Sequence, residues 1–237
     1  MKLVIFILSG MFAASVCIAQ EKNTVTDADG NVYHTVKIGN QVWTVENLRT
    51  TKYNDNTPIA LDTLAINWAK GISGEYCYFK NTTNKDSIKK YGALYNWYAV
   101  DTKKLAPPGW RVPMNEDWAH LISYLVNNGY NWDGTKIGNK CAKSLAAQSD
   151  WQTDKTPGAV GCDLSKNNQS GFSALPGGFR FYGGNFDPFG ILGSWWSATD
   201  DKEYNHASCY QIYSDYYNFE WLYCTWNSGN SVRLIRN

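Results

Sequence analysis

The sequence predicts an α+β fold built of twisted antiparallel sheets with two helices and long loops. Strand-like segments occupy residues 25–48 and 195–237, and helical periodicity is confined to the middle of the chain. A stretch rich in glycine, asparagine and proline, over 149–194, separates the helices from the final strands. An N-terminal hairpin, central helices, a long loop region and a terminal antiparallel sheet together make an α+β domain.

The first 19 residues have the pattern of a signal peptide for export. Lys2 precedes an apolar run from Leu3 to Val16, and small residues follow it. A run of this length is too short to span a bilayer as a helix. No other stretch approaches about 18 apolar residues, so we expect no transmembrane segment in the mature protein. The chain is therefore expected outside the cell or on the outer cell surface.

Two processing routes remain open. Cleavage after Ala19 leaves Gln20 as the new N-terminus of a secreted protein. Cleavage before Cys17 makes a lipoprotein, since Ala14-Ser15-Val16-Cys17 partly resembles a lipobox. In the second case a lipid on Cys17 anchors the protein to a membrane.

We divide the mature chain into a short segment, 20–26, and a single domain over 27–237. No internal repeat and no charge-rich linker interrupts the domain.

Residues 25–48 are expected to form strands joined by tight turns. Gly39-Asn40 separates two β-rich runs by two residues, which is typical of a hairpin. A two-residue loop at this point places Val36 opposite Trp43 and His34 opposite Val45.

The middle of the chain contains the helices. Residues 50–90 indicate surface loops around a short strand at 76–79, and the apolar segment 91–100 is either a helix or a strand. After Pro113, apolar residues recur at helical spacing, with Asn115 as the expected cap and Gly129 as the end. The recurring residues are Trp118, Leu121, Ile122, Leu125 and Val126. A weaker pattern predicts a second helix over about 136–147.

Charge and motif content argue against two classes of function. The chain has 22 Lys+Arg against 21 Asp+Glu, and only five of the basic residues are Arg. Such a balance excludes nucleic acid as the default partner, because phosphate neutralisation requires a concentrated basic surface. The histidines, His34, His120 and His206, fall in no recognised catalytic motif, and no nucleophile or phosphate-binding motif occurs. We therefore expect no enzyme activity.

Five cysteines remain after Cys17, so at least one is unpaired or pairs between molecules. They are Cys77, Cys141, Cys162, Cys209 and Cys224, and no two of them form a C-x-x-C motif. If the terminal hairpin turns at 215–218, Cys209 lies directly opposite Cys224. We therefore predict a disulfide between these two residues.

Aromatic residues are unusually dense near the C-terminus. Of all residues 15% are aromatic, and 11 of them fall between Trp195 and Trp226. In the hairpin that we predict, both faces carry aromatics, which is more than a core requires, so one face is expected to meet a ligand. The alternative is ordinary cross-strand packing. The predicted ligand-binding residues are Tyr210, Tyr213, Tyr216, Tyr217, Trp221, Tyr223 and Trp226.

No metal or cofactor is predicted, and calcium is the one alternative kept. Asp163, Asn167 and Asn168 make an oxygen-rich loop that could ligate a hard cation. Loop capping by these side chains is the favoured interpretation. Three arginines, Arg111, Arg180 and Arg233, are interpreted as structural donors to carboxylates or backbone carbonyls.

Several phrases together resemble one known family. They are DADGNVYHTVKIGNQVWTVENL, YGALYNWYAV, PPGWRVPMNEDW, GFSALPGGFR, SWWSAT and SVRLIRN. In this order they resemble the Fibrobacter succinogenes major paralogous domain family, from about Asp27 to Asn237. Thr44 and Met114 depart from the family pattern, which commonly has Met and Thr there.

The resemblance implies an exported bacterial surface protein, often a lipoprotein, with a C-type-lectin-like fold and no established activity. In that fold the first and last strands pair, so Val32–Ile38 is expected beside Ser231–Arg236.

The leading hypothesis is a non-catalytic cell-surface module that binds carbohydrate or a protein partner through its aromatic C-terminal hairpin. One alternative is a structural, fimbria-like envelope component that assembles through the same residues. Another is a lectin-like receptor whose C-terminal strands are diversified by a retroelement.

Overall fold

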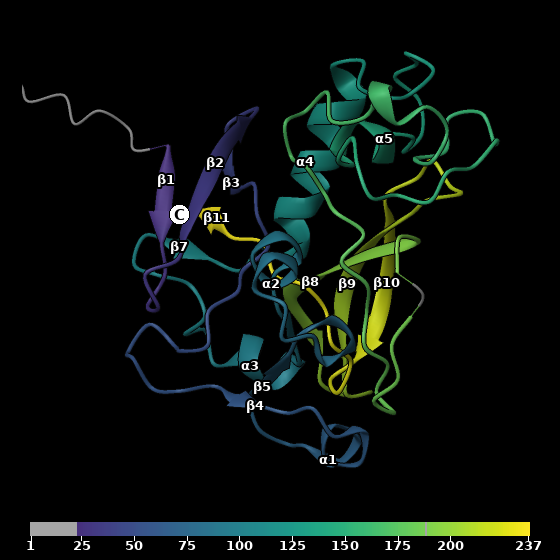
Figure 1. The fold of residues 1–237 in the computed structure, drawn as a ribbon. Coiled ribbons are helices and arrows are strands. Elements are labelled where there is room, and N and C mark those ends of the chain that lie inside the picture. The colour runs from purple at the N-terminus through teal and green to yellow at the C-terminus, as the bar shows by residue number, and fades with distance from the viewer. Residues whose placement is uncertain (1–22, 188) are drawn as a thin grey trace, which may run out of the picture.

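The computed structural model describes residues 23–187 and 189–237, and within them it contains three sheets and five α-helices (Figure 1). This arrangement confirms the α+β class. The predicted signal peptide and the lipobox around Cys17 lie outside the described residues. Within the described ranges, no helix is both long enough and apolar enough to cross a membrane.

The first sheet has five strands in the order β1-β2-β3-β11-β7. Val36 lies opposite Trp43, as the two-residue turn predicts, and Gly39 in that turn has a φ of +63°. The strands are β1 (Thr24–Thr26), β2 (Val32–Ile38), β3 (Gln41–Thr44), β7 (Trp110–Arg111) and β11 (Ile235–Arg236).

The C-terminal strand does not pair with β2, contrary to expectation. Instead β11 lies between β3 and β7, with Ile235 opposite both Trp43 and Arg111. The reason is that β2 is already flanked on both sides, by β1 and by β3. The C-terminus nevertheless returns to the sheet in which the described chain begins (Figure 1).

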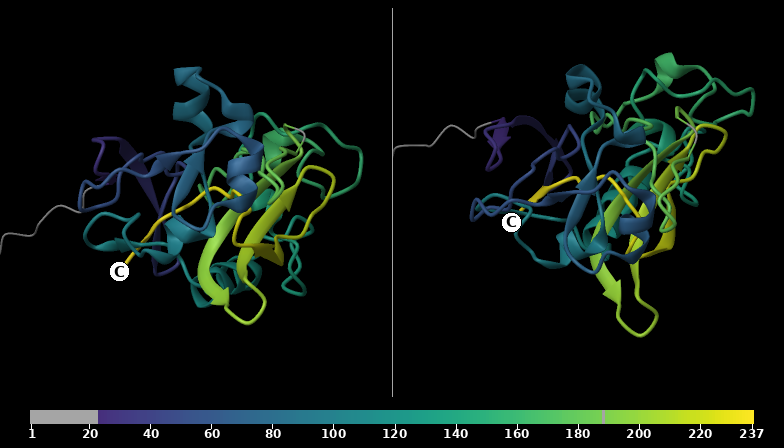
Figure 2. Two further views of the ribbon diagram at one scale, coloured as in Figure 1. Left: turned by 90° about the horizontal axis from the view of Figure 1, so that it is seen from below. Right: turned by 60° about the horizontal axis from the view of Figure 1, so that its bottom comes forward.

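The second sheet contains the C-terminal hairpin. Its order is β10-β9-β8, so β10 is an edge strand. The strands are β8 (Leu192–Asp201), β9 (His206–Tyr213) and β10 (Glu220–Thr225). A bulge interrupts the pairing of β8 with β9 between Trp196 and Asp200. Beyond it, the turn from β8 to β9 projects from the body of the molecule (Figure 2).

The third sheet is small and contains the one parallel pair among the described strands. Its strands are β4 (Ala60–Leu61), β5 (Glu75–Cys77) and β6 (Leu94–Tyr95), and β4 runs parallel to β5. Around it lie the short helices α1 (Ala65–Lys70), η1 (Phe79–Asn81), α2 (Lys85–Tyr91) and α3 (Trp97–Asp101). The ambiguous segment 91–100 thus becomes both a strand and a helix, because Asn96 accepts a hydrogen bond from the Ala99 N–H and starts α3.

The longest helix, α4 (Asn115–Asn127), lies between the first and second sheets (Figure 1). Its cap differs from the prediction, because Met114 is the capping position and Asp117 accepts the Met114 N–H at 2.7 Å. The Asn115 amide instead donates to Ser208 Oγ on β9. Trp118 joins the layers, since its ring lies 4.7 Å from Trp43 of β3.

The second predicted helix is much shorter than expected. Only α5 (Ala142–Leu145) forms, whereas the prediction extended back to 136. Gly138, inside the predicted span, has a φ of +73°, which breaks the helical path. The Asn131 amide holds this loop by donating to the carbonyl of Thr135 at 2.8 Å.

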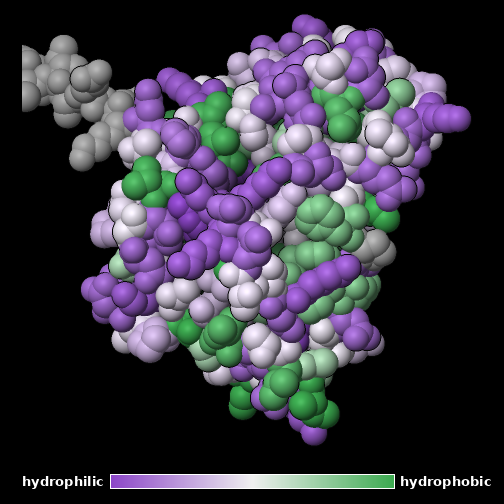
Figure 3. Space-filling view, viewed as in Figure 1, coloured by the Kyte–Doolittle hydropathy of each residue, from purple (hydrophilic) through white to green (hydrophobic). Residues whose placement is uncertain are grey.

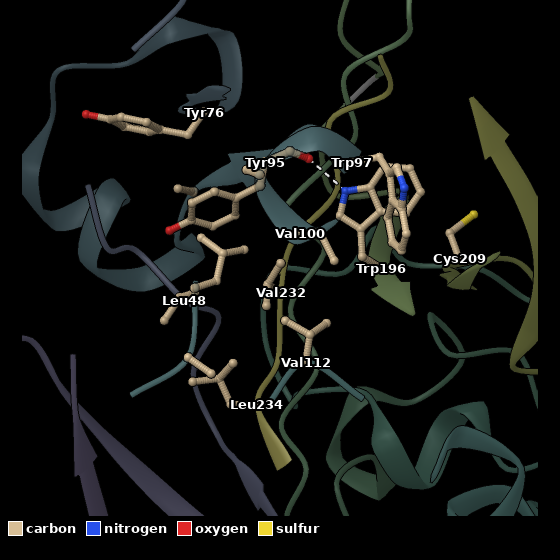
Figure 4. Packing of buried hydrophobic residues seen from close by; sticks show 14 of the residues in the cluster. Leu48, Tyr76, Tyr95, Trp97, Val100, Val112, Trp196, Cys209, Val232 and Leu234 are labelled. Carbon is tan, nitrogen blue, oxygen red and sulfur yellow. Dashed lines mark hydrogen bonds between the residues drawn. The ribbon is translucent and has the colours of Figure 1, made fainter. Parts of the chain in front are cut away.

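The tryptophans form much of the core. Trp196 on β8 packs against Trp97 with ring centroids 5.5 Å apart, and its indole N–H donates to the Tyr95 carbonyl at 2.7 Å (Figure 4). Burying rings of this size is a large apolar contribution to stability. The fully or almost fully buried tryptophans of the family phrases are Trp43, Trp97, Trp118, Trp195 and Trp196, whereas Trp110 is half-buried.

The three arginines of the family phrases are structural, as predicted. Arg111 forms a two-pronged ion pair with Asp117. Arg180 donates to the carbonyls of Asp62 and Gly184. The third, the fully buried Arg233, donates to the carbonyls of Thr44, Phe172 and Ser173. Charged side chains that donate to several backbone carbonyls fix loops that are not held by strand pairing.

The outer surface in the view of Figure 3 is mainly hydrophilic, with apolar surface over α1 at the bottom. Leu61, Leu64, Ile66 and Ile72 are exposed in this region. Helix α1 contacts the chain just after β10, because the Trp68 indole donates to the Asn227 carbonyl and the Asn227 amide donates to the carbonyls of Trp68 and Gly71.

Candidate functional site

The exposed aromatic rings of the hairpin sit on its edge strand. Trp221 and Tyr223 on β10 are 46% and 54% exposed, and their ring centroids are 4.9 Å apart. They point to the same face of the strand because they are two residues apart. We call these two residues the edge pair. His206, opposite Thr225 at the end of the strand, lies 6.4 Å from the Tyr223 ring.

Helix α4 explains why only the edge strand presents its rings. Trp118 stacks on Tyr210 of β9, with centroids 5.1 Å apart and planes 24° apart. Asn115, at the start of the helix, binds Ser208 on the same strand. The helix thus covers β9, whereas β10 extends past it and leaves the edge pair uncovered.

A cleft of about 390 Å³ opens beside the edge strand. Aromatic and apolar side chains from β9, from β10 and from the loop before β8 line it. These residues, the aromatic cleft, are Phe179, Phe181, Tyr182, Asp187, Leu192, Gln211, Tyr213, Leu222, Tyr223, Cys224, Thr225 and Ser228. Tyr223 belongs to both features, although the edge pair lies on the opposite face of the strand from Leu222 and Cys224.

Polar groups within the cleft are held in place. The Tyr213 hydroxyl donates to Gln211 Oε1 at 2.5 Å, and the Gln211 amide donates to Ser194 Oγ at 3.0 Å. Burial raises the pKa of the Asp187 carboxyl. Burial, followed by the nearby Asp187 charge, raises the pKa of Tyr213. The cleft therefore offers fixed hydrogen-bonding groups among aromatic walls, as ligand sites commonly do.

The hairpin turn carries a further pair of rings. Tyr216 and Tyr217 stack with centroids 4.9 Å apart. The Tyr217 ring also lies 6.3 Å from Trp132, in the loop after α4. Tyr216 is exposed and Tyr217 is half-buried, so the turn extends the aromatic surface away from the edge pair.

Two of the seven predicted ligand-binding residues are placed differently from the rest. Tyr210 is only 4% exposed and belongs to the core beneath α4. Trp226 is half-buried, with its ring 5.7 Å from Tyr98. Of the remaining five, Tyr216, Trp221 and Tyr223 are exposed, whereas Tyr213 and Tyr217 are half-buried. Tyr213 lies on the opposite face of the sheet from Trp221 and Tyr223.

The predicted disulfide is present, but the predicted register is wrong. Cys209 is bonded to Cys224, whereas its direct partner across the strands is Leu222. Residues that lie directly opposite each other, such as Trp221 and Tyr210, have numbers that sum to 431. The predicted pairing of Cys209 with Cys224 corresponds to a sum of 433. A shift by two keeps every side chain on its predicted face, so the pairing of cysteines survives as a diagonal contact.

Cysteine chemistry is limited by this bond. Since Cys209 is in a disulfide, it cannot act with His206 as a nucleophile. Burial raises the pKa of both Cys77 and Cys141 to about 12, which keeps them as thiols. Cys162 is the half-buried free cysteine of the described chain.

The oxygen-rich loop is held together by its own side chains. Asn167 donates to the carbonyls of Ala147 and Val160, and Asn168 bonds Ser173 through both its amide and its oxygen. Asp163 Oδ1 accepts the Ser165 hydroxyl. Across the part of the chain that the structure describes, no group of His, Cys, Asp or Glu is arranged to hold a metal ion.

A lysine occupies the carbonyl-rich centre of the same loop. The buried Lys143 amine donates to the carbonyls of Ala159 at 3.3 Å and Asp163 at 3.0 Å, and to that of Cys162. Carbonyl oxygens converging in this way suit a cation, and here the ammonium supplies the charge.

Sequence reasoning missed the wall of the cleft that the loop before β8 provides. Phe181 and Tyr182 are exposed aromatics, and Asp187 is half-buried. The residues FRFY at 179–182 contain a signal, because aromatics alternate with an arginine in an otherwise glycine-rich loop. Their position beside β9 and β10 depends on the path of a long loop, which spacing does not define.

Comparisons with known proteins identify a family. A model described as the Fibrobacter succinogenes major domain matches residues 36–236. This span includes β3 to β11, all five α-helices and the whole aromatic hairpin. No curated protein and no solved structure matches the chain.

Proposed function

This chain belongs to the Fibrobacter succinogenes major domain family, and we propose that it is an exported, non-catalytic module that binds carbohydrate through its C-terminal hairpin. The edge pair is the observation that carries the proposal. Trp221 and Tyr223 present large flat rings to solvent on a strand stabilised by a disulfide. Exposing aromatic rings of this size to water is unfavourable, and neighbouring exposed rings often mark a binding surface. Their flat faces suit stacking on sugar rings.

The aromatic cleft supports the same ligand class. Sugars combine apolar ring faces with hydroxyl groups, so they require aromatic surface and fixed polar groups together. Tyr223 supplies the first at the rim, while Asp187 and Gln211 supply acceptors and donors inside. Because Gln211 is already oriented by Ser194 and Tyr213, binding need not order it further.

We further propose that the domain is C-type-lectin-like and is displayed at the cell surface. The order of a β hairpin, a long helix, extended loops and a returning C-terminal strand supports this assignment. The apolar run after Lys2 supports export.

A glycan array with the mature protein, run with calcium and with a chelator, tests the proposal. We expect binding that Trp221→Ala or Tyr223→Ala weakens by about tenfold or more, because a few Tyr and Trp residues dominate such contacts. Tyr124→Ala is the matched control, since Tyr124 is an exposed tyrosine on α4. An array without any bound glycan, or equal losses in all three variants, contradicts the proposal.

Assembly into an envelope structure is a second candidate, and the edge position of β10 favours it. Trp221, Leu222 and Tyr223 are three successive exposed residues on a sheet edge, which can pair with a strand of another chain. Light scattering of the mature protein distinguishes the candidates. If the edge assembles, Leu222→Lys converts oligomers to monomers, because a lysine on an edge strand opposes pairing.

A further inference from the structure

A second cavity, separate from the hairpin, has an apolar floor and a charged rim. It encloses about 310 Å³ where the end of α3, the link from β7 to α4, and β8 meet. Val100, Ala106 and Val112 form its floor, and all three are buried members of the main core cluster. Figure 4 shows Val100 and Val112 in that cluster.

The β-bulge in β8 borders this cavity. Pairing with β9 lapses between Trp196 and Asp200, and within this gap the Ala198 N–H donates to the Pro113 carbonyl instead. The small Ala198 side chain lines the cavity, and Met114, which is 44% exposed, lies at its rim. Bulges often adjoin binding sites because they redirect a strand away from its partner.

Two cationic residues, Lys103 and Arg111, line the cavity, and of these two Arg111 forms an ion pair with a carboxylate. Arg111 is neutralised by Asp117 through two hydrogen bonds. Among the described ion pairs none involves Lys103, whereas its neighbour Lys104 binds Asp55 at 2.8 Å. The Lys103 backbone is fixed in a left-handed turn with φ +59°, and its N–H donates to the Val100 carbonyl. The turn thus holds an uncommitted positive charge at the mouth of an apolar cavity.

We propose that this cavity binds a medium-chain alkyl carboxylate, with the alkyl chain on the valine floor and the carboxylate at Lys103. At roughly 30 Å³ per atom, a volume near 310 Å³ holds about ten non-hydrogen atoms, which is the size of octanoate. The apolar lining excludes a strongly hydrated ligand, and the single free cation selects an anion over a neutral lipid.

Titration calorimetry with octanoate on the mature protein tests the site. We expect Lys103→Gln to weaken octanoate binding by about threefold to tenfold, since one partly exposed ion pair is lost. Lys104→Gln removes the same charge one residue away and should leave the affinity unchanged. Octan-1-ol should not distinguish Lys103→Gln from the unaltered protein, and butyrate should bind far more weakly than octanoate.

Two further measurements locate the ligand. Ala198→Phe fills the cavity and should abolish binding, and octanoate should shift the methyl resonances of Val100 and Val112 in the unaltered protein. Trp221→Ala should not affect octanoate, because the hairpin surface is elsewhere. The absence of octanoate binding, methyl shifts confined to other residues, or equal losses in Lys103→Gln and Lys104→Gln would each overturn the proposal.

Discussion

Cys209 and Cys224 are joined by a disulfide although they are not opposite each other in the β9–β10 ladder. Their Cα atoms are 6.1 Å apart, and Leu222 is the direct partner of Cys209. The bond therefore crosses the hairpin diagonally. It joins the edge strand to a buried strand, because Cys209 is fully buried and β10 has no neighbour on its other side.

Removing this disulfide should destabilise the domain. For a separation of 15 residues, loss of the bond in a Cys209→Ser/Cys224→Ser variant should lower the free energy of unfolding by no more than about 3 kcal/mol. Chemical denaturation measures this change, and Cys162→Ser is the control with an unpaired cysteine. A non-reduced peptide map that links Cys224 to any other cysteine would refute the assignment.

The aromatic residues of the hairpin should separate into two groups in thermal melts. Trp221→Ala and Tyr223→Ala should change the free energy of unfolding by about 0.5 kcal/mol or less, because both rings are exposed. Tyr210→Ala should cost about 3–5 kcal/mol, since its ring is buried under Trp118. Trp226→Ala should fall between them because the ring is half-buried against Tyr98. Equal effects for Trp221 and Tyr210 would mean that the edge pair is also core.

Asp117 should make stability depend on pH. Burial opposes its ionisation, but hydrogen bonds from Arg111 and from the Met114 N–H outweigh burial, so the net pKa lies below the usual value. A carboxyl whose folded pKa is lowered stabilises the protein above its unfolded pKa of about 3.9, and this contribution is lost as pH falls through the folded pKa.

Asp117→Asn should therefore reduce the free energy of unfolding by about 1–2 kcal/mol at pH 6, through loss of the cap and the ion pair. The difference from the unaltered protein should shrink below about pH 4. Denaturant titrations across this range measure it. Glu116→Gln, an exposed change in the same helical turn, is the control, and a difference that stays constant down to pH 2 would contradict the assignment.

Calcium should not stabilise this protein. The Lys143 ammonium already satisfies three carbonyls of the oxygen-rich loop, so neither calcium nor a chelator should shift the melting temperature. Lys143→Met should cost about 2–4 kcal/mol, because those carbonyls lose their donor. Lys166→Met, which removes an exposed lysine from the same loop, should cost little. A melting temperature that rises with calcium in the unaltered protein would disprove this account.

The N-terminus of the native protein should reveal the export route. Mass spectrometry should find either Gln20 as the first residue or a lipid-modified Cys17, because the apolar run after Lys2 has the length of a signal peptide. Mature protein that retains Met1 would exclude export with signal removal. Palmitate labelling separates the two routes. A lipoprotein is labelled in its unaltered form and loses the label in a Cys17→Ser variant, whereas a secreted protein is labelled in neither form.

Local patterns predicted the elements that depend on local forces. The turn at Gly39-Asn40 placed Val36 opposite Trp43, because a two-residue loop leaves one register. The apolar spacing after Pro113 predicted the helix, but the capping residue is Met114, one residue before the predicted Asn115. The second helix was predicted too long, because apolar spacing does not show that Gly138 has a left-handed backbone.

The candidate site was only partly predictable. The excess of rings between Trp195 and Trp226 is visible in composition, and it located the hairpin. Which rings are exposed was decided by α4, which covers Tyr210 but does not reach Trp221. The far wall of the cleft, with Tyr182 and Asp187, is formed by a loop. No periodic pattern in the sequence predicts the path of that loop.

By itself, the sequence determined the α+β class, the family, the cysteine pair and the location of the aromatic hairpin, because periodicity, turn chemistry and motif order are properties of neighbouring residues. The tertiary structure alone decided that β11 joins β3 and β7, that β10 is an edge, and that Lys143 fills the carbonyl centre of a distant loop. These outcomes depend on contacts between segments far apart in the chain. Such contacts are selected by the burial and hydrogen bonding of the whole fold, which no local pattern records.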